Sequence, residues 1–310
     1  MKQAFVFPGQ GSQAVGMGKD LAAAFAPARE IFEEVDEALK QKLSALMFEG
    51  PEQDLTLTEN AQPALMAVSM AVIRVLEREG GLDLAADAQF VAGHSLGEYS
   101  ALAAVGSISL AETAALLRIR GRAMQDAAPV GVGAMAAILG LDFEAVAEIA
   151  ATAAEGDVCT AANDNAPGQV VISGHAAAVS RAADLAKEKG ARRAVMLPVT
   201  VPSHCSLMAP AADVMADALA AVEIAPPPVP VVANVEAQAI ATPEEIRAAL
   251  IAQVTGMVRW RESVLWMRDQ GVERLVEVGA GKVLSGLARR IDKELDALSL
   301  SAPKEIDAFL

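Results

Sequence analysis

The chain has 310 residues, 53% of them hydrophobic, so it is long enough for one large domain or two smaller ones with a substantial core. Its formal net charge of −15 argues against nucleic acid as a partner, because phosphate binding needs basic patches. Two cysteines and three histidines supply neither a disulfide framework nor the ligand set of a structural metal site.

At the N-terminus, residues 3–7 are expected to form a buried strand, and the loop Pro8-Gly9-Gln10-Gly11-Ser12-Gln13 follows it. Neither a phosphate-binding loop nor a dinucleotide fingerprint fits this loop, because the remaining residues of both motifs are missing. The start of the chain lacks the basic head and cleavage site of a signal peptide. No apolar run approaches the ~20 residues of a membrane span, so a cytoplasmic protein with no membrane partner is expected.

A Gly-x-Ser-x-Gly turn, Gly93-His94-Ser95-Leu96-Gly97, lies between a short apolar strand and a helix that ends near residue 105. Helices at 19–48 and 58–78, separated by Gly50-Pro51, are predicted to precede it. The two glycines permit a sharp bend that lifts the serine hydroxyl onto a strained corner. Unpaired N–H groups at the start of the helix can bind developing negative charge. Ser95 is therefore the candidate nucleophile, against the alternative of a plain strand–helix turn.

The next predicted helix, at 110–126, carries Arg118, Arg120 and Arg122. At 100° per residue, Arg120 falls on the apolar stripe of this helix, whereas Arg118 and Arg122 lie on the opposite face. A buried guanidinium needs a partner. Two kinds of partner satisfy that need: a fixed internal carboxylate, or the carboxylate of a ligand, which the planar fork of arginine grips at two points.

The segment 131–197 has a pattern of its own. Strands are predicted at 133–139, 157–162, 169–173 and 192–197, with a helix at 142–153 capped by Asp142 and another at 176–189. A turn-rich loop at 163–168 joins the second and third strands. The order β-α-β-β-α-β is that of ferredoxin-like folds. We interpret 131–197 as a small α/β domain inserted into a larger one, formed by 1–130 and 198–310.

After this insertion, strands are predicted at 229–232 and 274–278, the latter as the last core strand. One helix is predicted to end near residue 222, and two more are predicted at 243–253 and 258–269. A final helix is predicted after the turn Gly279-Ala280-Gly281-Lys282.

A serine nucleophile needs a general base, and His204 is the best candidate. The side chain of His94 should diverge from its neighbour Ser95, and His175 fits a solvated corner of the small domain. An acid between Ser95 and His204 is not obvious, so either a carbonyl orients His204 or the triad interpretation fails. A satisfied loop histidine is the alternative for His204, and Cys205 is interpreted as a small half-buried thiol.

Five segments, in this order and spacing, together resemble the malonyl-CoA:acyl carrier protein transacylases of dissociated fatty-acid synthesis. The resemblance covers nearly the whole chain. The segments are Phe5-Val6-Phe7-Pro8-Gly9-Gln10-Gly11-Ser12-Gln13, the run from Gly93 to Leu102, Arg120-Gly121-x-x-Met124-Gln125, Pro167-Gly168-Gln169-Val170-Val171-Ile172-Ser173-Gly174 and Val201-Pro202-Ser203-His204-Cys205.

The resemblance implies an α/β-hydrolase-like large domain with a parallel sheet and a ferredoxin-like insert. It implies that Ser95 carries the malonyl ester and that His204 acts as base and acid, oriented by the Gln253 backbone carbonyl. Further roles follow for the oxyanion-hole N–H groups of Gln10 and Leu96, for Arg120 on the malonyl carboxylate, and for Asn163 and Asn165 near the thioester arm. The Tyr-Asn-Pro that often follows the glutamine in the family is Val254-Thr255-Gly256-Met257 here.

The expected activity is malonyl transfer from malonyl-CoA to the phosphopantetheine thiol of acyl carrier protein by a ping-pong mechanism, without a metal or other cofactor, in a monomer. The alternatives are a stand-alone polyketide-type acyltransferase, a serine esterase or thioesterase, and a non-catalytic carrier-binding protein. An acidic carrier requires a local basic patch on this acidic chain. The candidates are Lys187, Lys189, Arg192 and Arg193, and Lys282, Arg289 and Arg290.

Overall fold

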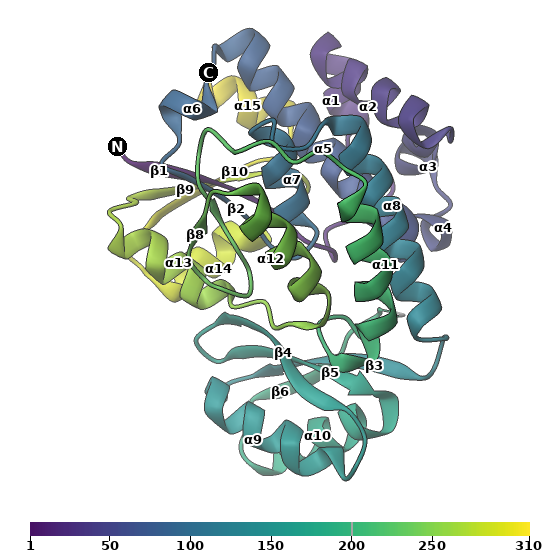
Figure 1. Ribbon diagram of the computed structural model, residues 1–310. Helices are drawn as coiled ribbons and strands as arrows, with labels where there is room; N and C mark the ends of the chain where they lie inside the picture. Colours follow the sequence, from purple (N-terminus) through teal and green to yellow (C-terminus); the bar gives the residue numbers. More distant parts are fainter. Residues whose placement is uncertain (200) are drawn as a thin grey trace.

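The computed structural model describes residues 1–199 and 201–310, which form two separate sheets. The six-stranded sheet has the order β10-β9-β1-β2-β7-β8, and the four-stranded sheet, at the bottom of Figure 1, has the order β4-β5-β3-β6. This mixed α/β architecture, with a mainly parallel sheet and a separate antiparallel sheet, confirms the predicted α/β class.

The six-stranded sheet is built around β1 (Gln3–Phe7), which pairs in parallel with β2 (Phe90–Gly93) and β9 (Arg274–Val278). Strand β2 also pairs in parallel with β7 (Val231–Val232), and β8 (Ala239–Ile240) pairs antiparallel with β7. The prediction that β9 is the last core strand is wrong, because β10 (Asp296–Leu300) adds to its edge in parallel.

Helices cover both faces of this sheet, as a parallel sheet requires. Phe5 and Phe7 point into a large apolar cluster with the almost fully buried helix α5, whereas Ala4 and Val6 pack with Trp260 and the helices after it. The helices are α1 (Lys19–Ala24), α2 (Ala26–Leu39), α3 (Leu43–Glu49), α4 (Glu52–Thr56), α5 (Thr58–Gly80), α6 (Leu84–Asp87), α7 (Gly97–Ala104), α8 (Leu110–Ala127), α11 (Ala209–Ala220), α12 (Pro243–Thr255), α13 (Trp260–Asp269), α14 (Val283–Ile291) and α15 (Pro303–Phe309).

The single helix predicted at 19–48 is three helices, α1 to α3. Phe25 is extended at the first break, and Pro27 stands at the start of α2, where its missing N–H costs nothing. Lys40 is left-handed, with a φ of 50°, and ends α2. The helix after β9 is not the final one either, since α15 follows β10. Of the helices described, none combines the length and the apolar character needed to cross a membrane.

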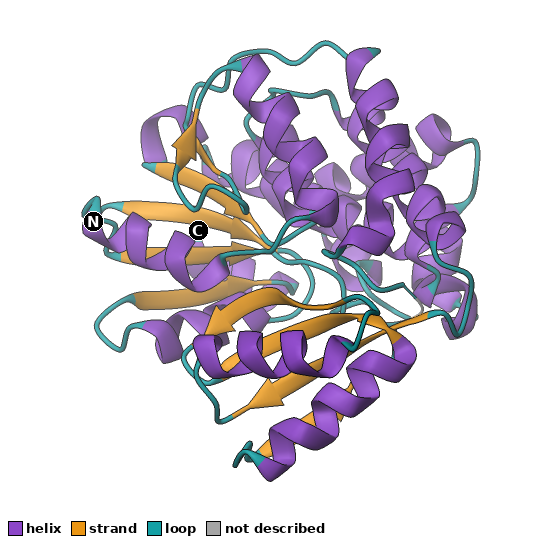
Figure 2. Ribbon diagram, turned by 60° about the horizontal axis from the view of Figure 1, so that its bottom comes forward, coloured by secondary structure: helices purple, strands orange, loops and turns teal. Residues whose placement is uncertain are grey.

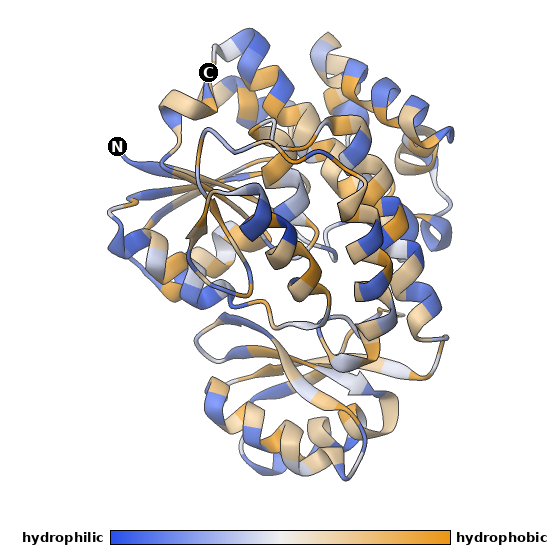
Figure 3. Ribbon diagram, viewed as in Figure 1, coloured by the Kyte–Doolittle hydropathy of each residue, from blue (hydrophilic) through white to orange (hydrophobic). Residues whose placement is uncertain are grey.

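The antiparallel sheet consists of β3 (Gly133–Leu139), β4 (Cys159–Ala166), β5 (Gln169–His175) and β6 (Arg193–Met196). Helices α9 (Phe143–Ala154) and α10 (Ala176–Glu188) lie against one face of it (Figure 2). Both helices carry hydrophobic as well as hydrophilic residues (Figure 3), and the hydrophobic ones pack in one cluster with residues of β3, β4 and β5. Asp142 precedes α9, but its side chain makes no capping hydrogen bond, contrary to the prediction.

The loop predicted at 163–168 is mostly strand. Strand β4 continues through Asn163 and Asn165 to Ala166, and its register against β5 shifts just before Asn163 and again at Asn165. Irregular pairing of this kind re-aims side chains. Asn163 is also bridged in parallel to Val258, so β4 contacts the chain before α13 as well as its own sheet. The two asparagines therefore lie where the antiparallel sheet meets the rest of the molecule.

Candidate active site

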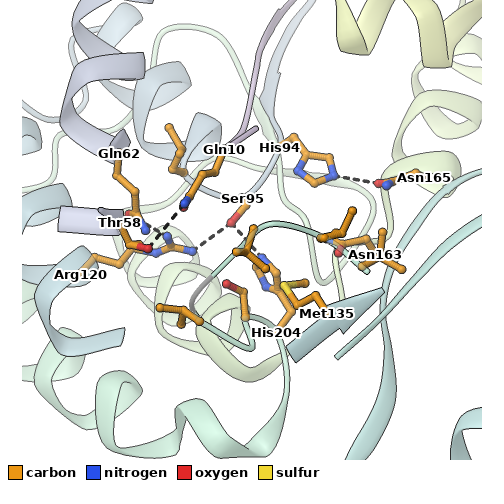
Figure 4. Close-up of a pocket in the computed structure, with 16 residues that line it drawn as sticks. Gln10, Thr58, Gln62, His94, Ser95, Arg120, Met135, Asn163, Asn165 and His204 are labelled. Atoms are coloured by element: carbon orange, nitrogen blue, oxygen red, sulfur yellow. Dashed lines mark hydrogen bonds between the residues drawn. The ribbon is translucent and has the colours of Figure 1, made fainter. Parts of the chain in front are cut away.

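A pocket of about 160 Å³ lies between the two sheets, and Figure 4 shows its lining. Ser95 and Leu96 reach it from the turn after β2, and Gln10 from the loop after β1. Because both strands run in parallel, their carboxyl ends meet at this edge, where open α/β sheets bind ligands. The antiparallel sheet supplies the opposite wall, including Met135.

Ser95 occupies a strained corner between β2 and α7. Its φ is 54°, a left-handed conformation that non-glycine residues rarely adopt. The flanking glycines are needed because the backbone is crowded. A Cβ at Gly93 would lie 1.9 Å from the carbonyl carbon of Gly97, and one at Gly97 would lie 2.2 Å from the carbonyl oxygen of Phe7. The turn thus has the geometry expected of a nucleophile elbow.

The ring of His204 lies between Ser95 and two backbone carbonyls. Its Nε2 is 2.9 Å from the Ser95 Oγ, and its Nδ1 is 2.8 Å from the carbonyl oxygen of Gln253 and 3.1 Å from that of Gly256. Carbonyls only accept, so Nδ1 carries the proton and Nε2 accepts from the serine hydroxyl. Burial and the nearby Arg120 charge lower the pKa of His204 to about 3, which keeps the ring neutral, with Nε2 free to accept the serine proton.

Arg120 is 1% exposed and points at the nucleophile (Figure 4). It donates to the Ser95 Oγ at 3.1 Å and to the Gln253 Oε1 at 2.7 Å. A further bond of 2.8 Å goes to the Oε1 of Gln62, on α5. Within the described chain Arg120 makes no ion pair, so its charge is available to a ligand. Its neighbour Arg118 is also buried, beside Glu59, so the prediction that it points outward is wrong.

Two backbone N–H groups of the pocket lining have no hydrogen-bond partner among the described residues. Those of Gln10 and Leu96 donate to no other described residue, whereas the Ser95 N–H is occupied by the Oδ1 of Asn234 at 2.7 Å. The side chain of Gln10 is anchored on Thr58, because its Nε2 donates to the Thr58 hydroxyl at 3.5 Å. Free N–H groups next to a nucleophile can stabilise an oxyanion.

The asparagines of β4 line the same pocket. The Oδ1 of Asn165 lies 2.9 Å from the Nε2 of His94, whose ring therefore turns away from the Ser95 hydroxyl, as predicted. Asn163 is 5% exposed and lines the wall opposite Arg120 (Figure 4). The structure thus brings together all eight residues named from the sequence, seven in the pocket lining and Gln253 directly behind it.

Gln62 and Asn234 are not among the residues predicted from the sequence, although Gln62 contacts Arg120 and Asn234 contacts Ser95. A weak signal existed for both. Gln62 is a polar residue within a strongly apolar helix, and Asn234 follows the apolar run Val231-Val232-Ala233. Among the described residues, no group of three or more His, Cys, Asp or Glu side chains is arranged to hold a metal ion.

Residues 4–296 match the family model described as the acyl transferase domain. The malonyl CoA-acyl carrier protein transacylase of Escherichia coli K12 is 49% identical over 307 residues, which cover 99% of this chain and 98% of the relative. The acyl-carrier-protein-S-malonyltransferase of Bartonella henselae has a TM-score of 0.97 and 57% identity, covering 100% of this chain and 98% of that one. A solved complex of a type II PKS acyl-carrier protein with its malonyl-transacylase has a TM-score of 0.96 and 44% identity, covering 99% of this chain and 98% of the matched chain.

Proposed function

Since the chain belongs to the acyl transferase domain family, as a member of its malonyl-CoA–acyl carrier protein transacylases, we propose that it transfers malonyl from malonyl-CoA to the phosphopantetheine thiol of acyl carrier protein. The observation that carries the proposal is the meeting of Ser95, neutral His204 and the unpaired cation of Arg120 in one pocket. A nucleophile alone would suit many acyl groups, but a buried cation 3.1 Å from its oxygen favours an acyl group with a carboxylate.

Acylation begins when the Ser95 Oγ attacks the thioester carbonyl while its proton passes to His204 Nε2, 2.9 Å away. The negative charge that develops on the carbonyl oxygen accepts hydrogen bonds from the N–H groups of Gln10 and Leu96. The C–S bond then breaks, and His204 returns the proton to the departing thiolate of coenzyme A. The Gln253 and Gly256 carbonyls stabilise the cationic ring in place of the acid of a triad.

The second half reaction repeats these steps with a new thiol. His204 deprotonates the phosphopantetheine thiol, the thiolate attacks the malonyl ester, and the proton returns to Ser95 as the ester C–O bond breaks. One thioester replaces another, so the reaction is nearly balanced. The difficulty is water, which must not reach the ester, and a small pocket walled by the antiparallel sheet suits that requirement.

We also propose how the chain divides into domains. We assign 1–130 and 198–310 to an α/β-hydrolase-like domain and 131–197 to an inserted ferredoxin-like domain. The strand–turn–helix at Ser95 and the order β3-α9-β4-β5-α10-β6 support this division. We also propose that the protein is a monomer that works in the cytoplasm and needs no cofactor, its two free, buried cysteines fitting a reducing compartment.

Two of the basic residues proposed to dock the carrier, one from each cluster, lie close to the turn between β4 and β5. Arg290, on α14, donates to Gln169 at the start of β5 at 2.5 Å. Arg192 packs on Gly140, which follows β3 and whose N–H donates to the carbonyl of Gly168, in the turn between β4 and β5. One member of each cluster thus flanks the β4–β5 turn, near the asparagine wall. A local basic patch here would attract an acidic carrier despite the net charge of −15.

A second candidate is a stand-alone acyltransferase of polyketide synthesis, which the similarity to the malonyl-transacylase in complex with a type II PKS carrier favours. The chemistry is the same and the carrier differs. Comparing the KM for carriers of the two pathways separates the candidates.

The test of the proposed function is intact mass after brief mixing with malonyl-CoA. We expect a malonyl adduct that maps to Ser95, is absent in Ser95→Ala, and disappears when acyl carrier protein is added. Free malonate without a lasting adduct would identify a thioesterase instead. Initial-rate kinetics should be ping-pong, and a sequential pattern without an acyl-serine species would refute the mechanism.

A further inference from the structure

Asn234 holds the elbow of Ser95 from a different strand. It follows β7 by two positions, and β7 pairs in parallel with β2, the strand that ends at Gly93. The Asn234 side chain is buried and uses both ends of its amide. Its Oδ1 accepts from the Ser95 N–H at 2.7 Å, and its Nδ2 donates to the Gly93 carbonyl at 2.6 Å.

A second layer of bonds fixes Asn234 and closes a ring around the serine. The Asn234 N–H donates to the Oε2 of Glu98 at 3.3 Å, and the same oxygen accepts from the Gln253 Nε2 at 3.2 Å. Gln253 also donates to the Ser95 carbonyl at 3.1 Å. Both peptide groups of Ser95 are therefore bonded to buried amide side chains, which are joined in turn through Glu98.

We propose that Asn234 is a positioning residue for the reaction: it holds Ser95 in its left-handed conformation and, by occupying the Ser95 N–H, leaves the oxyanion to the N–H groups of Leu96 and Gln10. This inference rests on the proposed acylation of Ser95. Asn234 reaches neither the pocket surface nor Arg120, so it acts on the nucleophile and not on the choice of acyl group.

The amide is the side chain that fits this position. The Ser95 N–H needs an acceptor and the Gly93 carbonyl needs a donor, and the two ends of one amide provide both. Without it, the left-handed φ of 54° at Ser95 loses a bond that compensates for its strain. The freed N–H would also compete with that of Leu96 for the developing charge.

Asn234→Ala tests the proposal, with Asn60→Ala as the matched control. Asn60 is also buried and bonds through both ends of its amide, to the Asp54 carbonyl at 2.8 Å and to Gln41 at 3.4 Å, but it does not contact the elbow. The measurement is the single-turnover rate of Ser95 acylation by malonyl-CoA and, separately, by acetyl-CoA, at a temperature at which thermal melts show each variant to be folded. Asn234→Ser, a neutral side chain too short to bridge both partners, is the second variant.

We expect Asn234→Ala to slow acylation by both thioesters by about tenfold to a hundredfold, since a buried donor and acceptor lose their partners. The ratio of the malonyl to the acetyl rate should stay within about twofold of wild type, because the Arg120 contacts are intact. Asn60→Ala should lose stability without losing rate. A folded Asn234 variant that acylates at the wild-type rate, or one that changes the ratio instead, would overturn the proposal.

The wild-type protein gives a measurement that does not depend on the folding of variants. If Asn234 clamps the elbow, the Ser95 amide should exchange its hydrogen as slowly as the amides of β2. Exchange at the rate of an exposed loop would refute the clamp. Failure of wild-type Ser95 to be acylated by malonyl-CoA would instead refute the proposed function, so the two failures are distinguishable.

Discussion

Replacing Arg120 with alanine should remove the preference for malonyl over acetyl. Arg120 is 1% exposed and its fork is held by Gln62 at 2.8 Å and Gln253 at 2.7 Å, which fixes the charge beside Ser95. Loss of one partner of a buried charge pair costs roughly 2–5 kcal/mol. At 1.4 kcal/mol per tenfold, malonyl transfer should fall by roughly thirtyfold to several thousandfold. Acetyl has no carboxylate, so it loses only the interaction between Arg120 and the Ser95 hydroxyl.

The assay is the acylation rate of Ser95 with each thioester, followed by intact mass and expressed as the malonyl to acetyl ratio. Arg122→Ala is the matched control, because Arg122 lies on the same helix but pairs with Glu59 and is largely exposed. Arg120→Lys should be intermediate, since lysine keeps the charge but loses the planar fork. An unchanged ratio in Arg120→Ala, with the protein folded, would refute the reasoning.

Four further predictions concern the base (two of them), the elbow and the carrier. Because the pKa of His204 is lowered from 6.5 to about 3, acylation should show no acidic limb near pH 6.5; an apparent pKa there in a pH–rate profile would contradict a neutral buried ring. The unfolded chain binds that proton first, so the contribution of His204 to folding stability should decrease as the pH falls from about 6.5 toward 3, as urea titrations at several pH values would show. Gly97→Ala should abolish acylation and lower the melting temperature, because its Cβ would lie 2.2 Å from the Phe7 carbonyl, whereas Gly286→Ala, with open space, should do neither. Combined Arg192→Glu and Arg290→Glu should raise the KM for acyl carrier protein and leave that for malonyl-CoA unchanged, in contrast to Lys42→Glu, directly before the distant helix α3 (Figure 1); an equal rise in both KM values would exclude the docking patch.

The sequence predicts those parts of the fold that depend on local pattern. The elbow was predictable because strand, turn glycines and helix are contiguous, and the inward face of Arg120 because helical spacing determines it. Arg118 was predicted on the wrong side because α8 packs on more than one neighbour, which a single apolar stripe does not reveal. The edge strand β10 is not predicted from the sequence, because it is defined by its pairing with β9, which a local sequence pattern does not reveal.

The site itself follows the same division between local and distant contacts. Arg120 lies 25 residues from Ser95, whereas His204, Asn234 and Gln253 lie 109, 139 and 158 residues away. His204 is the best candidate among the three histidines from the residues alone, whereas Gln253 is implied only by the resemblance to a known family. Asn234 belongs to no recognised motif, and it reaches Ser95 only because the two-residue strand β7 pairs with β2. A residue whose role depends on a neighbouring strand can be recognised only when the register of that strand is known. Ser95 could therefore be identified from the sequence, whereas Asn234, which holds it in place, could be identified only from the structure.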